Sequence, residues 1–169
     1  MSIYSGPGDD GETTCLNGRR VSKNSGIIHF IGTIDELNSH LGLVKAMLRE
    51  KEFIGKIQKI LMKLMSHVSD PENEKYFITD REVRSLEEET DGLSRNIPEI
   101  TGFILPGKSF AEARIQITRA VARRAERFFF AAKEDSPLCL NSGAYLNRLS
   151  DYLFILSQCE SLVDGNFIN

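Results

Sequence analysis

The sequence predicts an all-α protein, folded as an antiparallel five-helix bundle. Five segments have apolar residues at three- and four-residue intervals, the period of an amphipathic helix. Three of these segments begin with a residue pair that fits a capping box. No segment shows strand-like alternation of useful length, and the short connections favour antiparallel packing of neighbouring helices.

We assign the whole chain, residues 1–169, to a single domain, because this length suits one domain with a real core. Residues 1–26 precede the first predicted helix and are rich in glycine and small polar residues. Such a segment exposes backbone N–H groups that can cradle phosphate, but its composition is also typical of a terminal tail. It is not a Walker A loop, because the required Gly-Lys spacing is absent and no strand precedes it.

The helices are expected at residues 34–50, 53–69, 80–95, 109–134 and 142–163. The predicted capping boxes pair Thr33 with Glu36, Thr79 with Glu82 and Ser109 with Glu112. The last helix has its apolar seam at Leu146, Leu149, Leu153, Leu156 and Leu162.

The fourth predicted helix concentrates positive charge in a chain whose net charge is −3. Its arginines are Arg114, Arg119, Arg123, Arg124 and Arg127. Like charges at this spacing destabilise a helix unless something anionic meets them. A solvated basic face is one interpretation. A polyphosphate or carboxylate site is the other, since guanidinium groups bind such anions bidentately. The second is favoured by the preceding loop, residues 102–108, which places Phe103 near a helix N-terminus, where anions are favoured.

Composition narrows the class of protein. Mild acidity argues against general nucleic-acid binding, and no apolar run approaches the length of a membrane span. There is no signal-peptide pattern, and Cys15, Cys139 and Cys159 are unclustered. We therefore expect reduced thiols in a cytoplasmic protein, with no zinc site and no disulfide. The three histidines, His29, His40 and His67, are interpreted as structural or surface residues.

Six motifs, in order and at compatible spacing, resemble the ATP:cob(I)alamin adenosyltransferases of the PduO type. They lie at residues 5–14, 20–23, 32–38, 103–107, 119–127 and 145–151. The most diagnostic are Arg-Arg-Ala-Glu-Arg at 123–127 and Tyr-Leu-Asn-Arg-Leu-Ser-Asp at 145–151. The resemblance covers nearly the whole chain and implies a ferritin-like five-helix bundle that forms a homotrimer, with active sites between subunits.

The activity implied by the resemblance is transfer of the 5′-deoxyadenosyl group of ATP to the cobalt of cob(I)alamin, with release of triphosphate. ATP and cob(I)alamin would be substrates and Mg²⁺ a cofactor. A flavoprotein reductase and an adenosylcobalamin-dependent enzyme would be partners. The alternative is a non-catalytic relative that binds a corrinoid or nucleotide as a carrier or regulator. A plain structural bundle is a third possibility.

The resemblance also implies roles for single residues. Asp35 and Arg119 would pair between subunits, Arg123 would contact the triphosphate, and Phe103 would crowd the lower axial face of the corrin. Glu126 would hold the nucleoside or metal side. The full set implied for ATP is Ser5, Gly6, Pro7, Gly8, Thr13, Thr14, Lys23, Arg123, Arg124, Ala125, Glu126, Arg127 and Asn147.

Two stretches depart from the family pattern. The family usually has Thr-Arg-Thr-Gly-Asp-Lys-Gly near the start, whereas this chain has Ser-Gly-Pro-Gly-Asp-Asp-Gly at residues 5–11. Gly6 and Asp10 replace basic residues, so we expect weaker binding of triphosphate or altered closure of this loop. Residues 64–68, Leu-Met-Ser-His-Val, replace Leu-Gly-Ala-Asp-Leu of the family, which puts a contact of the second helix in doubt.

Overall fold

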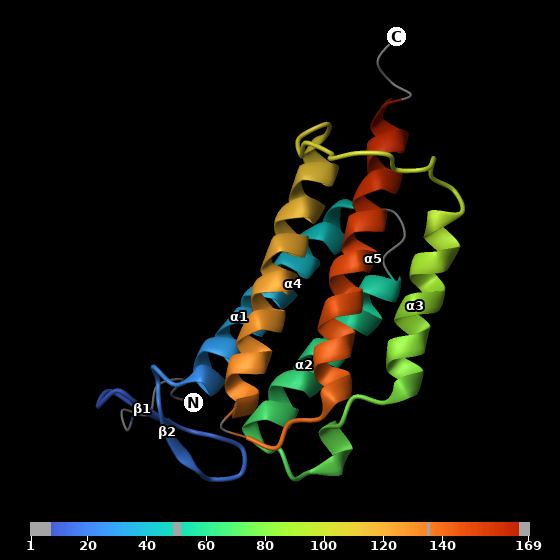
Figure 1. The fold of residues 1–169 in the computed structure, drawn as a ribbon. Helices are drawn as coiled ribbons and strands as arrows, with labels where there is room; N and C mark the ends of the chain where they lie inside the picture. Colours follow the sequence, from blue (N-terminus) through green and yellow to red (C-terminus); the bar gives the residue numbers. More distant parts are fainter. Residues whose placement is uncertain (1–7, 49–51, 135, 166–169) are drawn as a thin grey trace.

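The computed structural model describes residues 8–48, 52–134 and 136–165, and the first seven residues lie outside it. The described chain forms five α-helices and a small two-stranded hairpin, which are drawn in Figure 1. In chain order the elements are β1 (Glu12–Thr14), β2 (Arg20–Ser22), α1 (Gly26–Met47), α2 (Glu52–Ser69), a 3₁₀ turn (Glu74–Tyr76), α3 (Asp80–Ser94), α4 (Phe110–Glu134) and α5 (Leu140–Gly165). The prediction of an all-α, antiparallel five-helix bundle is confirmed, with the hairpin as an addition.

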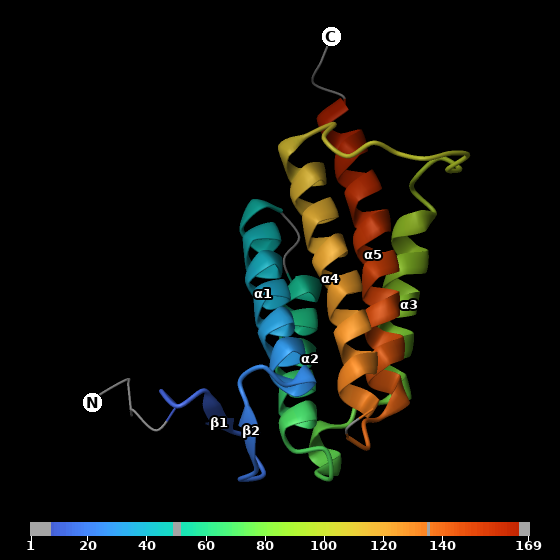
Figure 2. The same ribbon diagram turned by 60° about the vertical axis from the view of Figure 1, so that its left-hand side comes forward.

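The helices run up and down along one axis, with α4 packed between α1 and α5. Helix α2 lies against α1, and α3 lies against the other side of α5. Figure 2 shows the hairpin at one end of the bundle and the loop between α3 and α4 at the other. This loop connects the end of α3 to the start of α4 and contains Phe103. The 25 residues of α4 separate the two ends by roughly 37 Å at 1.5 Å per residue.

The core is formed by the apolar stripes of the five helices. Phe30 of α1 and Phe129 of α4 are fully buried, and their rings meet edge to face at 5.8 Å. Gly143 of α5 faces them, where an added Cβ would lie 2.9 Å from the Phe129 ring. The expected seam of α5 is buried from Leu146 to Leu156, but Leu162 is 44% exposed. That part of the prediction is wrong because α5 extends beyond the core there.

Helix α1 begins at Gly26, eight residues before the predicted start at Ile34. The predicted capping box of Thr33 and Glu36 is therefore wrong. Thr33 lies inside the helix, and its hydroxyl donates to the His29 carbonyl one turn back at 2.7 Å. The extra turns are stabilised because Ile27 and Phe30 are buried in the core.

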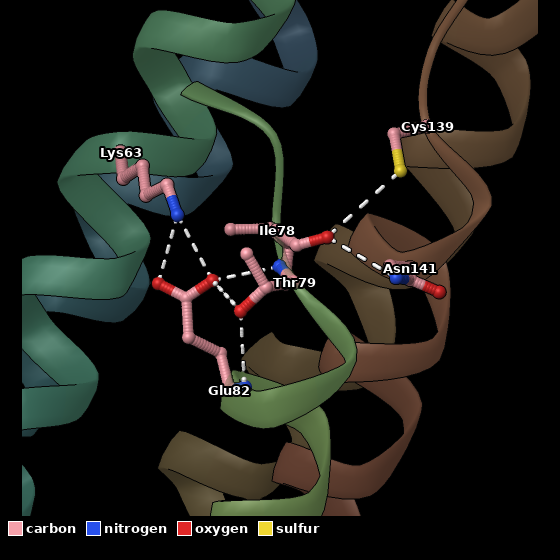
Figure 3. Close-up of polar contacts among 6 residues, drawn as sticks. All are labelled: Lys63, Ile78, Thr79, Glu82, Cys139 and Asn141. Carbon is pink, nitrogen blue, oxygen red and sulfur yellow. Dashed lines mark hydrogen bonds and ion pairs between the residues drawn. The ribbon is translucent and has the colours of Figure 1, made fainter. Parts of the chain in front are cut away.

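The other two predicted capping boxes differ in how completely they are formed. Figure 3 shows Thr79 and Glu82 at the start of α3, where both bonds of the box are present, which confirms that prediction. At the start of α4, Ser109 accepts the Glu112 N–H at 3.1 Å. The Glu112 carboxyl group, however, accepts from the N–H groups of Gly107 and Lys108. The box around Ser109 is thus only half formed.

The N-terminal segment contains the hairpin, which the sequence did not predict. Strands β1 and β2 pair antiparallel, with Thr13 opposite Val21. Each strand has three residues, which is too short for an alternating pattern to be recognised. Gly18 in the connecting turn has φ of +82°, a conformation that favours glycine. Cys15 is buried against the bundle, so this part of residues 1–26 is packed.

Candidate functional site

An outward stripe of α4 combines positive charge with exposed apolar side chains. Arg123, Arg127 and Phe130 are exposed at spacings of three and four residues on one side of α4, and Ile117, nearly two turns before them and further around the helix, is exposed as well. The apolar members are about half exposed: 48% for Ile117 and 49% for Phe130. We call these four residues the arginine stripe. Exposed aliphatic and aromatic groups beside arginines are typical of a surface that another molecule covers.

Neither arginine of the stripe has an acidic partner within the described part of the chain. The Arg127 guanidinium donates to the Arg123 backbone carbonyl at 3.1 Å, and the Arg123 side chain makes no hydrogen bond or ion pair there. Two guanidinium groups one turn apart therefore remain available for an anion. The interpretation of a fully paired, solvated basic face is not supported at these two positions.

The remaining polar residues of the motif are held by neighbouring helices. Arg124 forms an ion pair with Glu36 of α1. Glu126 accepts the Asn147 amide of α5 at 3.0 Å through Oε1. Arg119 donates at 2.7 Å to Gln116 within α4, and the Gln116 amide in turn donates to Ser157 of α5 at 2.9 Å. These contacts fix α4 between α1 and α5, so the arginine stripe stands on a rigid element. Figure 1 shows this central position of α4.

Three other predicted site residues have different surroundings within one chain. Ala125 is fully buried and belongs to the core. Asp35 is exposed on α1 and has no ion pair in the described residues, so it does not pair with Arg119 within the chain. Among the described residues of α4, Asn147 forms a hydrogen bond only with Glu126.

The hairpin end presents a second group of predicted residues. Lys23 donates to the Gly8 carbonyl at 2.5 Å, which closes the start of the described chain onto the hairpin. Thr13 is half-buried and Thr14 is exposed in β1. Ser5, Gly6 and Pro7 lie outside the described residues.

Asp10 has a partner that the sequence did not reveal. Arg20 of β2 binds Asp10 at 2.7 Å and Glu12 at 2.8 Å. Asp10 also accepts the Glu12 N–H at 3.1 Å. The Glu12 backbone hydrogen bond and the Arg20 guanidinium lower the pKa of Asp10, so the carboxylate stays ionised. Its charge is partly neutralised by Arg20 within the hairpin.

The Phe103 loop forms the third group, at the opposite end of the bundle. Phe103 is fully exposed and Leu105 is 85% exposed. The loop and the end of α5 line an open pocket of about 370 Å³, whose lining includes Phe103, Lys108 and Gln158. An exposed aromatic at the mouth of a cavity suits a large, flat, apolar ligand.

Glu112 holds this loop in place, a role that sequence reasoning missed. Its Oε2 accepts from the Gly107 N–H at 2.7 Å and the Lys108 N–H at 3.2 Å, and the residue is fully buried. Gly107 has φ of +111°, a backbone conformation at this turn that glycine adopts without the strain a side chain would cause. The Pro106-Gly107 dipeptide indicated a turn in the sequence, but no sequence pattern indicated that Glu112 accepts the hydrogen bonds of this loop.

These residues could bind Mg²⁺ only if the phosphates of a substrate supplied further ligands. No group of three or more His, Cys, Asp or Glu residues in the described chain could hold a metal by itself. Glu126 uses Oε1 for Asn147, and its other oxygen makes no hydrogen bond to the residues that the structure describes. Mg²⁺ is commonly bound by one or two carboxylates together with substrate phosphates, which matches a single available carboxylate oxygen.

His67 lies apart from these groups and is structural. It is fully buried in α2, and its Nε2 accepts the Cys139 N–H at 3.0 Å, which ties α2 to the start of α5. Burial, with a smaller effect of the Lys63 charge, lowers the pKa of His67. The imidazole is therefore neutral at neutral pH. No described helix is both long and apolar enough to cross a membrane.

Comparison with known proteins gives consistent results. Residues 3–160 match the family model described as cobalamin adenosyltransferase. The chain is 33% identical over 167 residues to corrinoid adenosyltransferase PduO of Citrobacter freundii, of which it covers 50%. It is 35% identical over 173 residues to corrinoid adenosyltransferase of Bacillus subtilis, covering 98% of this chain and 89% of the relative. The chain thus spans half the length of the first relative and most of the second.

Solved structures agree with the sequence comparison. A variant PduO-type ATP:corrinoid adenosyltransferase from Lactobacillus reuteri, complexed with cobalamin and ATP, superposes with a TM-score of 0.90. It is 25% identical, and the match covers 97% of this chain and 93% of that one.

Proposed function

Since the chain belongs to the cobalamin adenosyltransferase family, we propose that it transfers the 5′-deoxyadenosyl group of ATP to the cobalt of cob(I)alamin and releases triphosphate. The observation that supports this most directly is the arginine stripe. Arg123 and Arg127 stand on a helix held from both sides, and neither has an acidic partner in the described residues. Their free guanidinium groups suit the oxygens of a triphosphate.

The proposed reaction needs little acid–base chemistry from the protein. The electron pair of Co(I) forms a bond to C5′ of ATP, the C5′–O bond breaks, and its electron pair leaves with the triphosphate. Negative charge therefore develops on the leaving group, and positive groups directed at it lower the barrier. Mg²⁺ bound to the triphosphate would neutralise further charge, and the free oxygen of Glu126 would hold it. In-line positioning of cobalt and C5′ supplies the remaining contribution.

We assign the ATP contacts to Arg123, Arg127, Glu126 and the hairpin residues Gly8, Thr13, Thr14 and Lys23. Arg124 has a positioning role, because its guanidinium is engaged by Glu36. Phe103 is assigned to the corrin, since it is fully exposed beside a cavity at the end of α5. An aromatic group against the lower corrin face would exclude water and an axial ligand, which makes reduction of Co(II) to Co(I) easier.

The proposed active site is completed by a second copy of the chain, in a homotrimer. The hairpin and Phe103 lie at opposite ends of the bundle, roughly 37 Å apart along α4, so one chain does not bring both to one substrate pair. Asp35 has no ion-pair partner among the described residues of its own chain, and an Asp35–Arg119 contact between subunits would provide one. The exposed Ile117 and Phe130 would be covered by the same interface.

A flavoprotein reductase that supplies Co(I) and an enzyme that uses adenosylcobalamin are proposed partners, since the reaction needs the first and its product serves the second. Cytoplasmic location stays a prediction.

The test is a spectral assay of purified protein with cob(I)alamin, ATP and Mg²⁺. Formation of adenosylcobalamin with an equal amount of triphosphate is expected. Arg123→Ala should lower turnover by about 30- to 1000-fold, the effect of losing about 2–4 kcal/mol of leaving-group stabilisation. The matched control is Arg84→Ala, an exposed arginine of α3 away from the stripe, which should keep wild-type turnover.

A non-catalytic corrinoid- or nucleotide-binding relative is the second candidate, favoured by the loss of two basic residues at Gly6 and Asp10. Such a protein would bind ATP or a corrinoid and yield no adenosylcobalamin in this assay. Wild-type turnover in Arg123→Ala would instead contradict the assignment of the arginine stripe.

A further inference from the structure

A cleft between α2 and α3 lies outside both the arginine stripe and the Phe103 loop. Its volume is about 170 Å³. Its apolar walls are formed by Phe53, Ile57 and Ile60 of α2 and Leu86 of α3. Ile57 and Leu86 belong to the buried core, whereas Phe53 and Ile60 are only partly covered. The cleft is therefore an opening into the edge of the core.

Tyr145 of α5 lines this cleft, and no described residue is a hydrogen-bond partner for its hydroxyl group. The residue is 1% exposed, yet its hydroxyl makes no hydrogen bond to any described residue. Burial and then the nearby Glu82 charge raise the pKa of Tyr145, so the hydroxyl keeps its proton. The Tyr145 hydroxyl is not sealed off in the core but reaches the cleft, where a ligand atom would accept its hydrogen bond.

The charge at the mouth of the cleft is positive. Both oxygens of Glu82 accept from Lys63, at 2.8 and 2.9 Å, so this carboxylate is already compensated (Figure 3). Arg81, the residue before it, is exposed, lines the cleft and has no ion pair in the described chain. Lys56 on the α2 side pairs with Glu52 at 3.2 Å. The uncompensated group is therefore Arg81, which favours an anionic ligand.

We propose that this cleft is a binding site for a small aromatic carboxylate. The ring would lie between Ile57 and Leu86, a polar ring substituent would meet the Tyr145 hydroxyl, and the carboxylate would pair with Arg81. The size agrees, because an apolar cavity of about 150 Å³ holds benzene. Binding here does not require adenosyl transfer, so the test succeeds or fails independently of the proposed enzymatic activity.

The probe is 4-hydroxybenzoate, titrated into the full-length ¹⁵N-labelled protein and followed by NMR. We expect saturable shifts in α2 and α3 with a dissociation constant of about 1 mM or lower, unchanged by saturating ATP. Arg81→Gln should weaken binding about fivefold, since the lost charge-assisted contact is solvent-exposed. Tyr145→Phe should weaken it about threefold.

Two matched variants control for these effects. Arg84→Gln removes an exposed arginine of the same helix that does not line the cleft. Tyr152→Phe removes the hydroxyl of another buried tyrosine of α5 outside the cleft. Both should bind the probe as the wild type does. Absence of saturable shifts in α2 and α3, equal binding of 4-hydroxybenzylamine, or equal effects of Arg81→Gln and Arg84→Gln would each overturn the proposal. Because Arg81 is exposed, its replacement leaves the core intact, so the result stays interpretable.

Discussion

At the scale of single residues, Glu112 anchors a loop rather than completing a helix cap. Its carboxyl group accepts from the N–H groups of Gly107 and Lys108, which lie five and four residues before it. The fully exposed Phe103 lies a few residues further back in the same loop. The position of Phe103 therefore depends on a buried acidic residue that is not part of any of the six motifs.

Glu112→Ala should release this loop. We expect adenosyl transfer to fall about tenfold while the KM for ATP stays unchanged, because the loop carries Phe103, which is assigned to the corrin and not to ATP. Hydrogen exchange should show lost protection of the Gly107 and Lys108 amides. Glu112→Gln keeps an oxygen acceptor, so this variant should retain most of the adenosyl transfer and most of the amide protection. Unchanged protection in Glu112→Ala would contradict the anchoring role.

Asp10 illustrates how a neighbour alters the expected effect of a charge. The ion pair with Arg20 means that Asp10→Lys both removes a negative charge and frees Arg20 from one of its two acids. We expect the KM for ATP to fall severalfold at low salt, with kcat little changed. Asp9→Lys makes the same charge change on an exposed neighbour without an ion pair in the described residues, and it serves as the control. A higher KM that recovers with added magnesium would instead indicate that Asp10 helps to hold the metal.

His67 should make stability fall in mild acid. Burial keeps its folded-state pKa below the unfolded value of about 6.5, so the unfolded chain binds the proton more readily. The stabilisation is complete above about pH 6.5 and is lost as the pH falls toward the lowered folded pKa.

His67→Gln can still accept the Cys139 N–H but does not titrate. The free energy of unfolding, measured from pH 7.5 to 5, should decline less steeply in this variant, by up to about 1.4 kcal/mol per pH unit for one proton. Identical slopes for the two proteins would refute the role of His67.

At the scale of elements, the start of α3 is fixed by local bonds. Thr79 accepts the Glu82 N–H, and Glu82 accepts the Thr79 N–H and also binds Lys63 of α2 (Figure 3). Burial opposes ionisation of Glu82, but the hydrogen bonds from Lys63 and Thr79 lower its pKa. This capping box thus links the start of one helix to the side of another.

Thr79→Ala should lower the free energy of unfolding by about 1 kcal/mol, the usual effect of removing an N-cap hydroxyl. The matched variant is Thr90→Ala in the same helix, where the hydroxyl only donates to the Leu86 carbonyl one turn back. Because such a bond contributes little to a helix, this variant should be within about 0.5 kcal/mol of the wild type in denaturant unfolding. Equal losses of unfolding free energy in the two variants would show that the Thr79 hydroxyl stabilises the protein no more than the Thr90 hydroxyl does.

At the scale of the whole molecule, we propose that a second chain brings the two ends of the bundle into one active site. We expect a trimer at micromolar concentration in analytical ultracentrifugation. Asp35→Arg should weaken assembly, because it would place two cations at the proposed subunit contact with Arg119. The double variant Asp35→Arg/Arg119→Asp should recover it. A monomeric wild type, or no recovery in the double variant, would contradict the shared site.

The sequence by itself determined the helical periods, the Thr79–Glu82 capping box and the motifs that identify the family. These features depend on residues within a turn or on a recognisable string, so they can be read without knowing the packing. The early start of α1 could not be read in this way. Thr33 and Glu36 match a capping box locally, but burial of Ile27 and Phe30 extends the helix past it.

Only the tertiary structure decided which members of the predicted site are free and which are occupied. Arg124 meets Glu36, 88 residues away, whereas Arg123 and Arg127 on the outer face of α4 do not meet an acid in the described chain. The sequence presents these arginines as equivalent, because their spacing says nothing about what lies opposite each one. The arrangement of α1 against α4 distinguishes them, since side-chain pairing between helices depends on their packing in space.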